Sequence, residues 1–193
     1  ANIEKVYDEF VASDNLRQFL ARNSDKPLDT YYYKKGELSS VSAALDSFAF
    51  NATMRDVLPP YKENDFFRAA RIAEIKQLPD SVFVHHILLQ RSTKEEAAKV
   101  ADSLIAILNN TPGRFEEIAG EFSADKNPNT LPGVLGWFDQ QAYIPGMESV
   151  FEAPLNKLFT IETQYGLHLV KVTERTRLHK KVLLAVLVKE AVA

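Results

Sequence analysis

The first third of the chain shows apolar residues at helical spacing. They recur every three or four positions, at Ile3, Val6, Tyr7, Phe10 and Val11 and again at Leu16, Phe19 and Leu20. This spacing predicts two short helices. A polar stretch follows, and its Tyr31-Tyr32-Tyr33 run is compatible with a strand or an exposed aromatic patch. Beyond it we expect a helix over about 41–49, a break at Pro59-Pro60 and a strand over 66–75.

The pattern becomes clearer from Ser81 onward. Residues 82–89 are apolar on both alternating sets of positions apart from His85 and His86, as in a strand buried on both faces. Ser92-Thr93-Lys94-Glu95 then resembles a capping box. The elements predicted after it are a helix to Asn109-Asn110, a shorter helix over 115–122, a loop over 123–133, a strand at 135–138, a short helix near 147–152 and a strand over 166–173. This order predicts an α+β domain of roughly 95 residues.

The two halves of the chain echo each other at an offset of about 100 residues. Phe67, Ala69, Ala70, Arg71, Ile72 and Glu74 match Leu167, Leu169, Val170, Lys171, Val172 and Glu174 in character. We interpret residues 1–77 as a degenerate copy of the domain at 81–175, although two amphipathic strands can also match by chance. Residues 178–193 contain an apolar run bounded by lysines, and we expect this tail to form a strand that completes the first copy. Packing against 81–175 or pairing with another chain are the alternatives.

Composition narrows the class of protein. The chain has 193 residues, of which 46% are hydrophobic and 25% charged, with a net charge of −3. A hydrophobic fraction of this size is enough for the chain to fold around a core. The chain lacks the surplus of Lys and Arg with which proteins bind nucleic acid or anionic lipid, so neither is an expected partner. With no cysteine, thiolate metal sites, disulfides and cysteine nucleophiles are excluded. No apolar run approaches the roughly 20 residues of a membrane span, so we expect no membrane contact from this segment, whether or not a parent protein is anchored elsewhere.

Four motifs occur in order between residues 81 and 175. They are VHHILL at 84–89, RFEEIAGEFS at 114–123, GVLGWF at 133–138 and TQYGLH at 163–168. Together they resemble the parvulin family of peptidyl-prolyl cis/trans isomerases. The resemblance implies an antiparallel sheet surrounded by helices and an isomerase that needs no cofactor or metal.

The resemblance also implies which side chains form the site. His86 and His168 would be the paired histidines, hydrogen-bonded with Thr163, and Asp125 would face the rotating carbonyl. The proline ring would lie among four further residues, namely Leu135, Tyr143, Met147 and Phe151. Two departures from the family pattern concern loop geometry and pocket size: Pro132-Gly133-Val134 replaces the usual Gly-Gly-Asp, and Tyr143 replaces a common Met.

Simpler explanations exist for each of these residues. A buried histidine is often only a satisfied core residue, Asp125 is also suited to capping a turn, and Met147 and Phe151 could be ordinary core. A zinc site on His85, His86 and His168 is disfavoured because adjacent strand residues point to opposite faces.

The expected substrates are unfolded or extended proline-containing polypeptides. Gln90-Arg91-Ser92-Thr93-Lys94 is shorter and less basic than the phosphate-gripping loop of phosphoselective parvulins, so we expect no phosphate requirement. The run Leu78-Pro79-Asp80-Ser81 resembles envelope foldases of the SurA/PpiD type, which implies a periplasmic or cell-envelope chaperone. The alternative is a peptide-binding chaperone without catalysis. At the offset of 100, Arg68 and Glu63 replace His168 and Thr163, so the first copy should be inactive.

Overall fold

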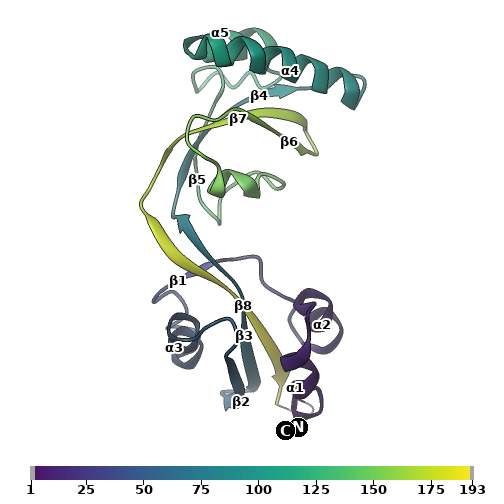
Figure 1. Cartoon of the computed structure of the whole chain (residues 1–193), viewed down its shortest axis with the longest axis vertical. Helices are drawn as coiled ribbons and strands as arrows, with labels where there is room; N and C mark the ends of the chain where they lie inside the picture. The colour runs from purple at the N-terminus through teal and green to yellow at the C-terminus, as the bar shows by residue number, and fades with distance from the viewer. Residues whose placement is uncertain (1–2, 192–193) are drawn as a thin grey trace. The chain divides into compact units, whose positions relative to one another are not determined.

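The computed structural model describes residues 3–191, which fold as two compact units (Figure 1). Unit 1 contains the residues up to Gln77 together with those from His179 onward, and unit 2 runs from Leu78 to Leu178. Within the described part of the chain, no helix combines the length and the apolar character needed to span a membrane.

Unit 2 is an antiparallel sheet with the strand order β5-β4-β7-β6. Its strands are β4 (Val82–Leu89), β5 (Val134–Phe138), β6 (Phe159–Thr163) and β7 (Gly166–Arg175). Its helices are α4 (Lys94–Asn110), η1 (Pro112–Arg114), α5 (Phe115–Phe122) and η2 (Glu148–Glu152), of which η1 and η2 are 3₁₀ helices. The prediction of an α+β fold with antiparallel sheets is confirmed.

The core of unit 2 lies between one face of the sheet and helices α4 and α5. Ile87 and Leu89 of β4 and Leu169 of β7 pack there against the apolar sides of the helices, which contribute Ala97, Ala101, Leu104, Leu108, Phe115, Ile118 and Ala119. Helix α4 begins after Thr93, whose hydroxyl accepts a hydrogen bond from the amide of Glu96 at 3.1 Å. The cap is therefore one residue later than the predicted box. Because strand residues alternate, His86 faces away from these helices.

Unit 1 is also built on a four-stranded sheet, with the order β1-β8-β3-β2. Its elements are α1 (Ile3–Ala12), α2 (Leu16–Asn23), β1 (Tyr33–Lys34), α3 (Ala43–Asn51), β2 (Val57–Glu63), β3 (Phe66–Pro79) and β8 (Leu178–Glu190). Helices α1 and α2 pack on one face with Ala69, Ala185 and Leu187. Helix α3 packs with Ala70 and Val182 in a separate cluster. The tail strand β8 thus lies in the middle of this sheet.

The two units share one succession of elements when unit 1 is followed from β8 (Figure 1). Unit 2 runs strand β4, helices α4 and α5, strand β5, helix η2, and strands β6 and β7. Unit 1 runs β8, then α1 and α2, β1, α3, and β2 and β3. The strand orders match position by position, with β8 taking the place of β4. Unit 1 therefore has the topology of unit 2 with its first strand supplied by the C-terminal part of the chain.

Two strands have no counterpart in the sequence-based expectation. Strand β2 includes Pro59 and Pro60, which usually argue against a strand because proline donates no ladder hydrogen bond. Here β2 is an edge strand, and its register with β3 shifts between Leu58 and Tyr61, which accommodates both prolines. Strand β6 is a five-residue edge strand. The expected helix near 147–152 is the 3₁₀ helix η2, and only the last tyrosine of the run at 31–33 enters a strand.

Candidate active site

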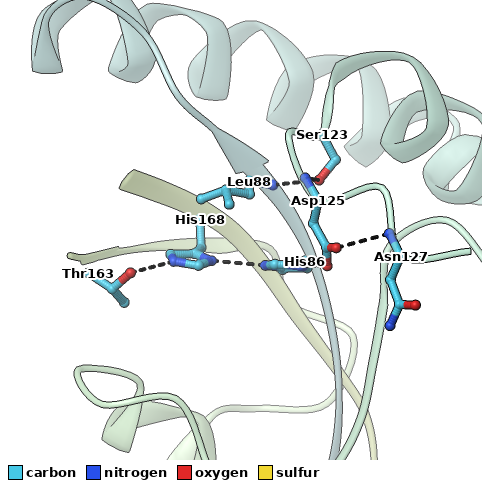
Figure 2. A network of polar contacts seen from close by, with 7 residues as sticks. All are labelled: His86, Leu88, Ser123, Asp125, Asn127, Thr163 and His168. Atoms are coloured by element: carbon cyan, nitrogen blue, oxygen red, sulfur yellow. Dashed lines mark hydrogen bonds and ion pairs between the residues drawn. The ribbon is translucent and has the colours of Figure 1, made fainter. Parts of the chain in front are cut away.

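Four polar side chains of unit 2 form one continuous chain of hydrogen bonds, shown in Figure 2. Asp125 Oδ2 lies 2.8 Å from His86 Nε2, and His86 Nδ1 lies 2.9 Å from His168 Nδ1. His168 Nε2 lies 2.6 Å from Thr163 Oγ1. The structure thus brings together all four residues that the sequence resemblance places at the centre of the site.

The two histidines are held by the two central strands of the sheet. His86 lies on β4 and His168 on β7, and the paired register sets His168 opposite Leu88. Their exposed fractions are 2% and 1%, so neither ring is open to water. Thr163 ends β6 at the tight connection to Gly166, and Asp125 lies in the loop that follows α5. Strand geometry therefore fixes the rings, whereas loop geometry fixes the carboxylate.

Hydrogen-bond chemistry sets one direction along the chain. An ionised Asp125 only accepts, so His86 Nε2–H must donate to it, which leaves His86 Nδ1 as the acceptor of a neutral ring. His168 then donates from Nδ1–H, and its Nε2 accepts from the hydroxyl of Thr163. All three hydrogen bonds are satisfied with both imidazoles neutral and with a negative charge at the Asp125 end.

The ionisation tendencies agree with this arrangement. Burial and the neighbouring His86 together lower the pKa of His168 to about 4, although the charge of Asp125 opposes this shift. Burial also lowers the pKa of His86, although the hydrogen bond and the charge of Asp125 oppose this shift. The hydrogen bond from His86 lowers the pKa of Asp125. At neutral pH the site therefore holds two neutral histidines and one carboxylate.

Ser123 fixes the loop that carries Asp125. Its hydroxyl accepts hydrogen bonds from the amide of Leu88 at 2.9 Å and from the amide of Asp125 at 3.3 Å (Figure 2). Asp125 Oδ1 in turn accepts from the amide of Asn127 at 3.2 Å. Ser123 is only 2% exposed, and it is not among the site residues predicted from the sequence. It is the last residue of the RFEEIAGEFS motif, which is the signal that could have identified it.

Gly133 connects the far end of the same loop to the histidine strand. Its carbonyl accepts the amide of His86 at 2.8 Å, and its φ of 84° suits glycine. A Cβ added there would lie 2.9 Å from both Ala119 Cβ and Phe115 Cε1. Despite the shortened sequence before β5, this glycine makes the close approach that joins the loop to α5 and β4.

The four apolar candidates lie on β5 and around η2. Met147 is fully buried, Phe151 is 8% exposed, and the Tyr143 and Phe151 rings meet edge to face at 5.7 Å. Leu135 is half-buried on β5. The turn before Met147 approaches the polar chain, since a Cβ on Gly146 would lie 3.3 Å from Thr163 Cγ2. The segment that carries Met147 and Phe151 therefore approaches the Thr163 end of the hydrogen-bonded chain.

The third histidine of this region belongs to the other face of the sheet. His85 Nε2 contacts Thr173 Oγ1 at 3.1 Å, and its ring meets Phe115 edge to face. Among residues 3–191, no group of three or more histidine, aspartate or glutamate side chains is arranged to hold a metal ion.

Comparison with known proteins places these residues in a family. The sequence pattern of the PPIC-type PPIase domain matches residues 67–176, more than half of the chain. The chain is 31% identical over 105 residues to the chaperone SurA of Pseudomonas fluorescens, which covers 51% of this chain and 24% of that protein. It is 29% identical over 141 residues to SurA of Pseudomonas aeruginosa, covering 67% of this chain and 33% of that protein.

A solved peptidyl-prolyl isomerase, PrsA of Bacillus anthracis, is 25% identical with a TM-score of 0.42, over 53% of this chain and 44% of that one. The chain spans about a quarter to a third of the length of the SurA relatives it matches. The family match covers the sheet strands and the loop that hold the polar chain. The chain therefore belongs to the PPIC-type peptidyl-prolyl isomerase family, the parvulin-type family that its motifs indicate.

Proposed function

We propose that unit 2 catalyses cis/trans isomerisation of X-Pro bonds in extended or unfolded polypeptides. The observation that carries this proposal is the continuous chain from Asp125 to Thr163, which meets an apolar segment built on Met147 and Phe151. Uncatalysed exchange of X-Pro bonds takes tens to hundreds of seconds because amide resonance opposes rotation. A site that favours the twisted amide over both planar forms accelerates the exchange without metal, cofactor or covalent intermediate.

Two features of the site favour the twisted amide. Rotation removes amide resonance and with it part of the charge separation of the amide. An apolar enclosure of the ring by Tyr143, Met147 and Phe151 therefore destabilises the planar forms more than the twisted form. A planar amide also carries partial negative charge on its carbonyl oxygen. A carboxylate at Asp125 repels that oxygen most strongly before the bond twists. His86 keeps Asp125 ionised and oriented by donating from Nε2. Each tenfold in rate needs only about 1.4 kcal/mol of such preference.

A prolyl-peptide exchange assay tests this proposal. The rate constant for an unphosphorylated X-Pro peptide is measured with the whole chain, next to the uncatalysed rate in the same buffer. We expect exchange that rises in proportion to protein concentration. Exchange at the uncatalysed rate, together with retained binding of an unfolded client protein, would instead support the chaperone without catalysis.

We further propose that phosphorylation of the substrate is not required. Only residues 90–93 connect β4 to α4, and Lys94 at the start of the helix is engaged in a 2.8 Å ion pair with Glu162. Arg91 donates to the carbonyl of Gln90. Matched Ser-Pro and phosphoserine-Pro peptides should be turned over at similar rates, and a strong preference for the phosphopeptide would contradict this.

Unit 1 is, in our proposal, a non-catalytic copy of the same fold. Its strand order supports this, as does the matching of faces: Ala69 faces the paired helices as Leu169 does, and Ala70 faces the opposite side with α3. At the positions of His168 and Thr163 it carries Arg68 and Glu63, which cannot form a neutral hydrogen-bonded chain. This difference is the observation that favours a peptide-binding role without catalysis for unit 1.

The proposed clients are unfolded envelope proteins, and the proposed location is the periplasm or cell envelope. The motif resemblance to envelope foldases and the similarity to chaperone SurA support this assignment. Fractionation of cells expressing the tagged full-length protein tests it, and recovery in the cytosolic fraction would contradict it.

A further inference from the structure

A pocket of about 320 Å³ lies on the face of unit 2 opposite the polar chain. It is lined by Leu108, Asn109, Pro112, Phe115, Asn156, Leu158 and Lys171. Lys171 follows Leu169 by two positions on β7, and Leu169 packs against the helices, so Lys171 lies on the helix face while His168 lies on the other. The pocket is at the lower end of the range of about 300–1,000 Å³ typical of small-ligand sites.

The ammonium group of Lys171 is the unusual feature of this pocket. It is half-buried, and within residues 3–191 it forms neither an ion pair nor a hydrogen bond. Its contact is with the Phe115 ring, whose centroid lies 4.6 Å from Nζ. Burial lowers the pKa of Lys171, and no carboxylate in the described part of the chain offsets the lost hydration. Positive charge without a nearby anion is thus held at the wall of a pocket.

The remaining walls define what fits beside this charge. Leu108, Phe115 and Leu158 are apolar, and the first two are at most 6% exposed. Asn109 and Asn156 also line the pocket and bring neutral hydrogen-bonding groups to it. A ligand that satisfies all of these groups combines one carboxylate with a short apolar portion, because a carboxylate accepts strong charge-assisted hydrogen bonds from an ammonium.

We propose that this pocket binds a peptide carboxylate flanked by an apolar residue, with Lys171 as its anchor. The carboxylate is either the C-terminal end of a polypeptide or an acidic side chain, since both present the same group. Such a site would hold a client chain on the sheet face opposite the proposed prolyl site. It does not depend on isomerase activity, because no pocket residue belongs to the Asp125–Thr163 chain.

The test uses three peptides without proline and the whole protein. They are acetyl-Ala-Ala-Leu with a free carboxylate, the same peptide with a C-terminal amide, and acetyl-Ala-Glu-Leu amide. Calorimetry gives their affinities, and NMR follows the Lys171 ε-methylene signal through a pH titration. Lys171→Met keeps the methylene stem but removes the charge. Lys157→Met is the matched control, because Lys157 is an exposed lysine beside the pocket that does not line it.

We expect at least one of the two acids to bind at least tenfold more tightly than the neutral amide and to raise the pKa of Lys171. Lys171→Met should lose this tenfold advantage, whereas Lys157→Met should keep it, and prolyl exchange should be unchanged in both variants. Preference for the free chain end or for the glutamate peptide identifies the source of the carboxylate. Equal binding of acids and amide, binding by neither acid, or unchanged binding by a folded Lys171→Met variant would overturn the proposal.

Discussion

Units 1 and 2 place different chemistry at corresponding positions of similarly ordered sheets. Unit 2 has His168 and Thr163 joined by a 2.6 Å hydrogen bond. Unit 1 has Arg68 and Glu63 at the offset of 100, with Arg68 Nη1 3.7 Å from Glu63 Oε1. Glu63 also accepts from Ser42, whose hydroxyl contacts that of Tyr61. A hydrogen bond between two neutral side chains in unit 2 thus corresponds to a charged pair in unit 1.

The comparison separates what the sheet provides from what the side chains provide. The positions around the site are buried alike: Ala70 and Val170 are fully buried, and Ile72 and Val172 are at most 1% exposed. A histidine can donate from one nitrogen and accept at the other, whereas an arginine only donates and keeps its charge. The shared topology therefore provides a desolvated location, and the histidines make that location suitable for a neutral chain that ends in a carboxylate.

Removal of β8 should have the largest effect, and it should affect the fold of unit 1 without affecting the activity of unit 2. Its residues Val182, Leu184, Ala185 and Leu187 are at most 2% exposed, and the strand lies between β1 and β3. Deleting residues 178–193 should therefore unfold residues 3–77 and leave prolyl exchange by unit 2 intact. Amide hydrogen exchange measures the first effect and peptide turnover the second. An N-terminal half that stays fully protected after the deletion would contradict the proposed domain arrangement.

Truncation of the buried apolar residues Met147 and Phe151 should reduce turnover strongly. Met147→Ala or Phe151→Ala removes part of the proposed enclosure of the proline ring, and each should also cost about 2–5 kcal/mol of stability as a large-to-small change in a core. Exchange per folded molecule is compared with the free energy of unfolding. Ile107→Ala, on an exposed part of α4, is the control and should change neither much. If activity fell only in proportion to the unfolded fraction, Met147 and Phe151 would have no role in the site beyond stabilising the fold.

Replacement of Asp125 should affect turnover more than stability. Asp125→Ala removes the carboxylate that we propose faces the substrate, and exchange should fall about tenfold or more, which corresponds to a loss of at least about 1.4 kcal/mol of transition-state preference. Asp125 also accepts from the amide of Asn127, so a role only as a turn cap predicts the reverse: a stability loss of order 1 kcal/mol with normal turnover. Asp125→Asn retains a hydrogen-bond acceptor and isolates the contribution of the charge.

Replacement of the pair in unit 1 should have the smallest effect. Arg68→Met combined with Glu63→Gln removes both charges, and an ion pair of this kind is often replaced at little cost when both partners change. We expect a stability change within about 1 kcal/mol and no change in prolyl exchange. A marked loss of turnover in this double variant would show that the two units do not divide the chemistry as proposed.

Local patterns predicted much of the fold but not the edge strands β2 and β6. The apolar run over 82–89 and the helical spacing over 94–110 correspond to β4 and α4, because burial of a strand on both faces and of a helix on one face produces these two patterns in the sequence. Strand β2 was missed because Pro59 and Pro60 lie at its register shift, which depends on the partner strand.

For the site, motif resemblance supplied the polar residues, and the structure supplied their connections. The direction of the hydrogen bonds follows from contacts between Asp125, His86 and His168, which lie up to 82 positions apart along the chain. The Ser123 hydroxyl accepts from backbone amides and the carbonyl of Gly133 accepts the amide of His86, and the sequence does not show which backbone groups these partners are. The Lys171 pocket draws on α4, η1, α5 and β7, so only the folded chain reveals it.

The pH dependence of prolyl exchange tests the neutral-histidine account most directly. NMR exchange spectroscopy measures it without a coupling protease. Because burial lowers both histidine pKa values, with that of His168 at about 4, turnover should stay constant from neutral pH through the ordinary histidine range near 6.5 and fall only at lower pH, where first His86 and then His168 becomes protonated. The unfolded state protonates first, so stability also declines below about 6.5, by up to about 1.4 kcal/mol per pH unit for each histidine, and circular dichroism must verify the fold. A turnover midpoint near 6.5 in folded protein, or no catalysis at neutral pH, would contradict the account.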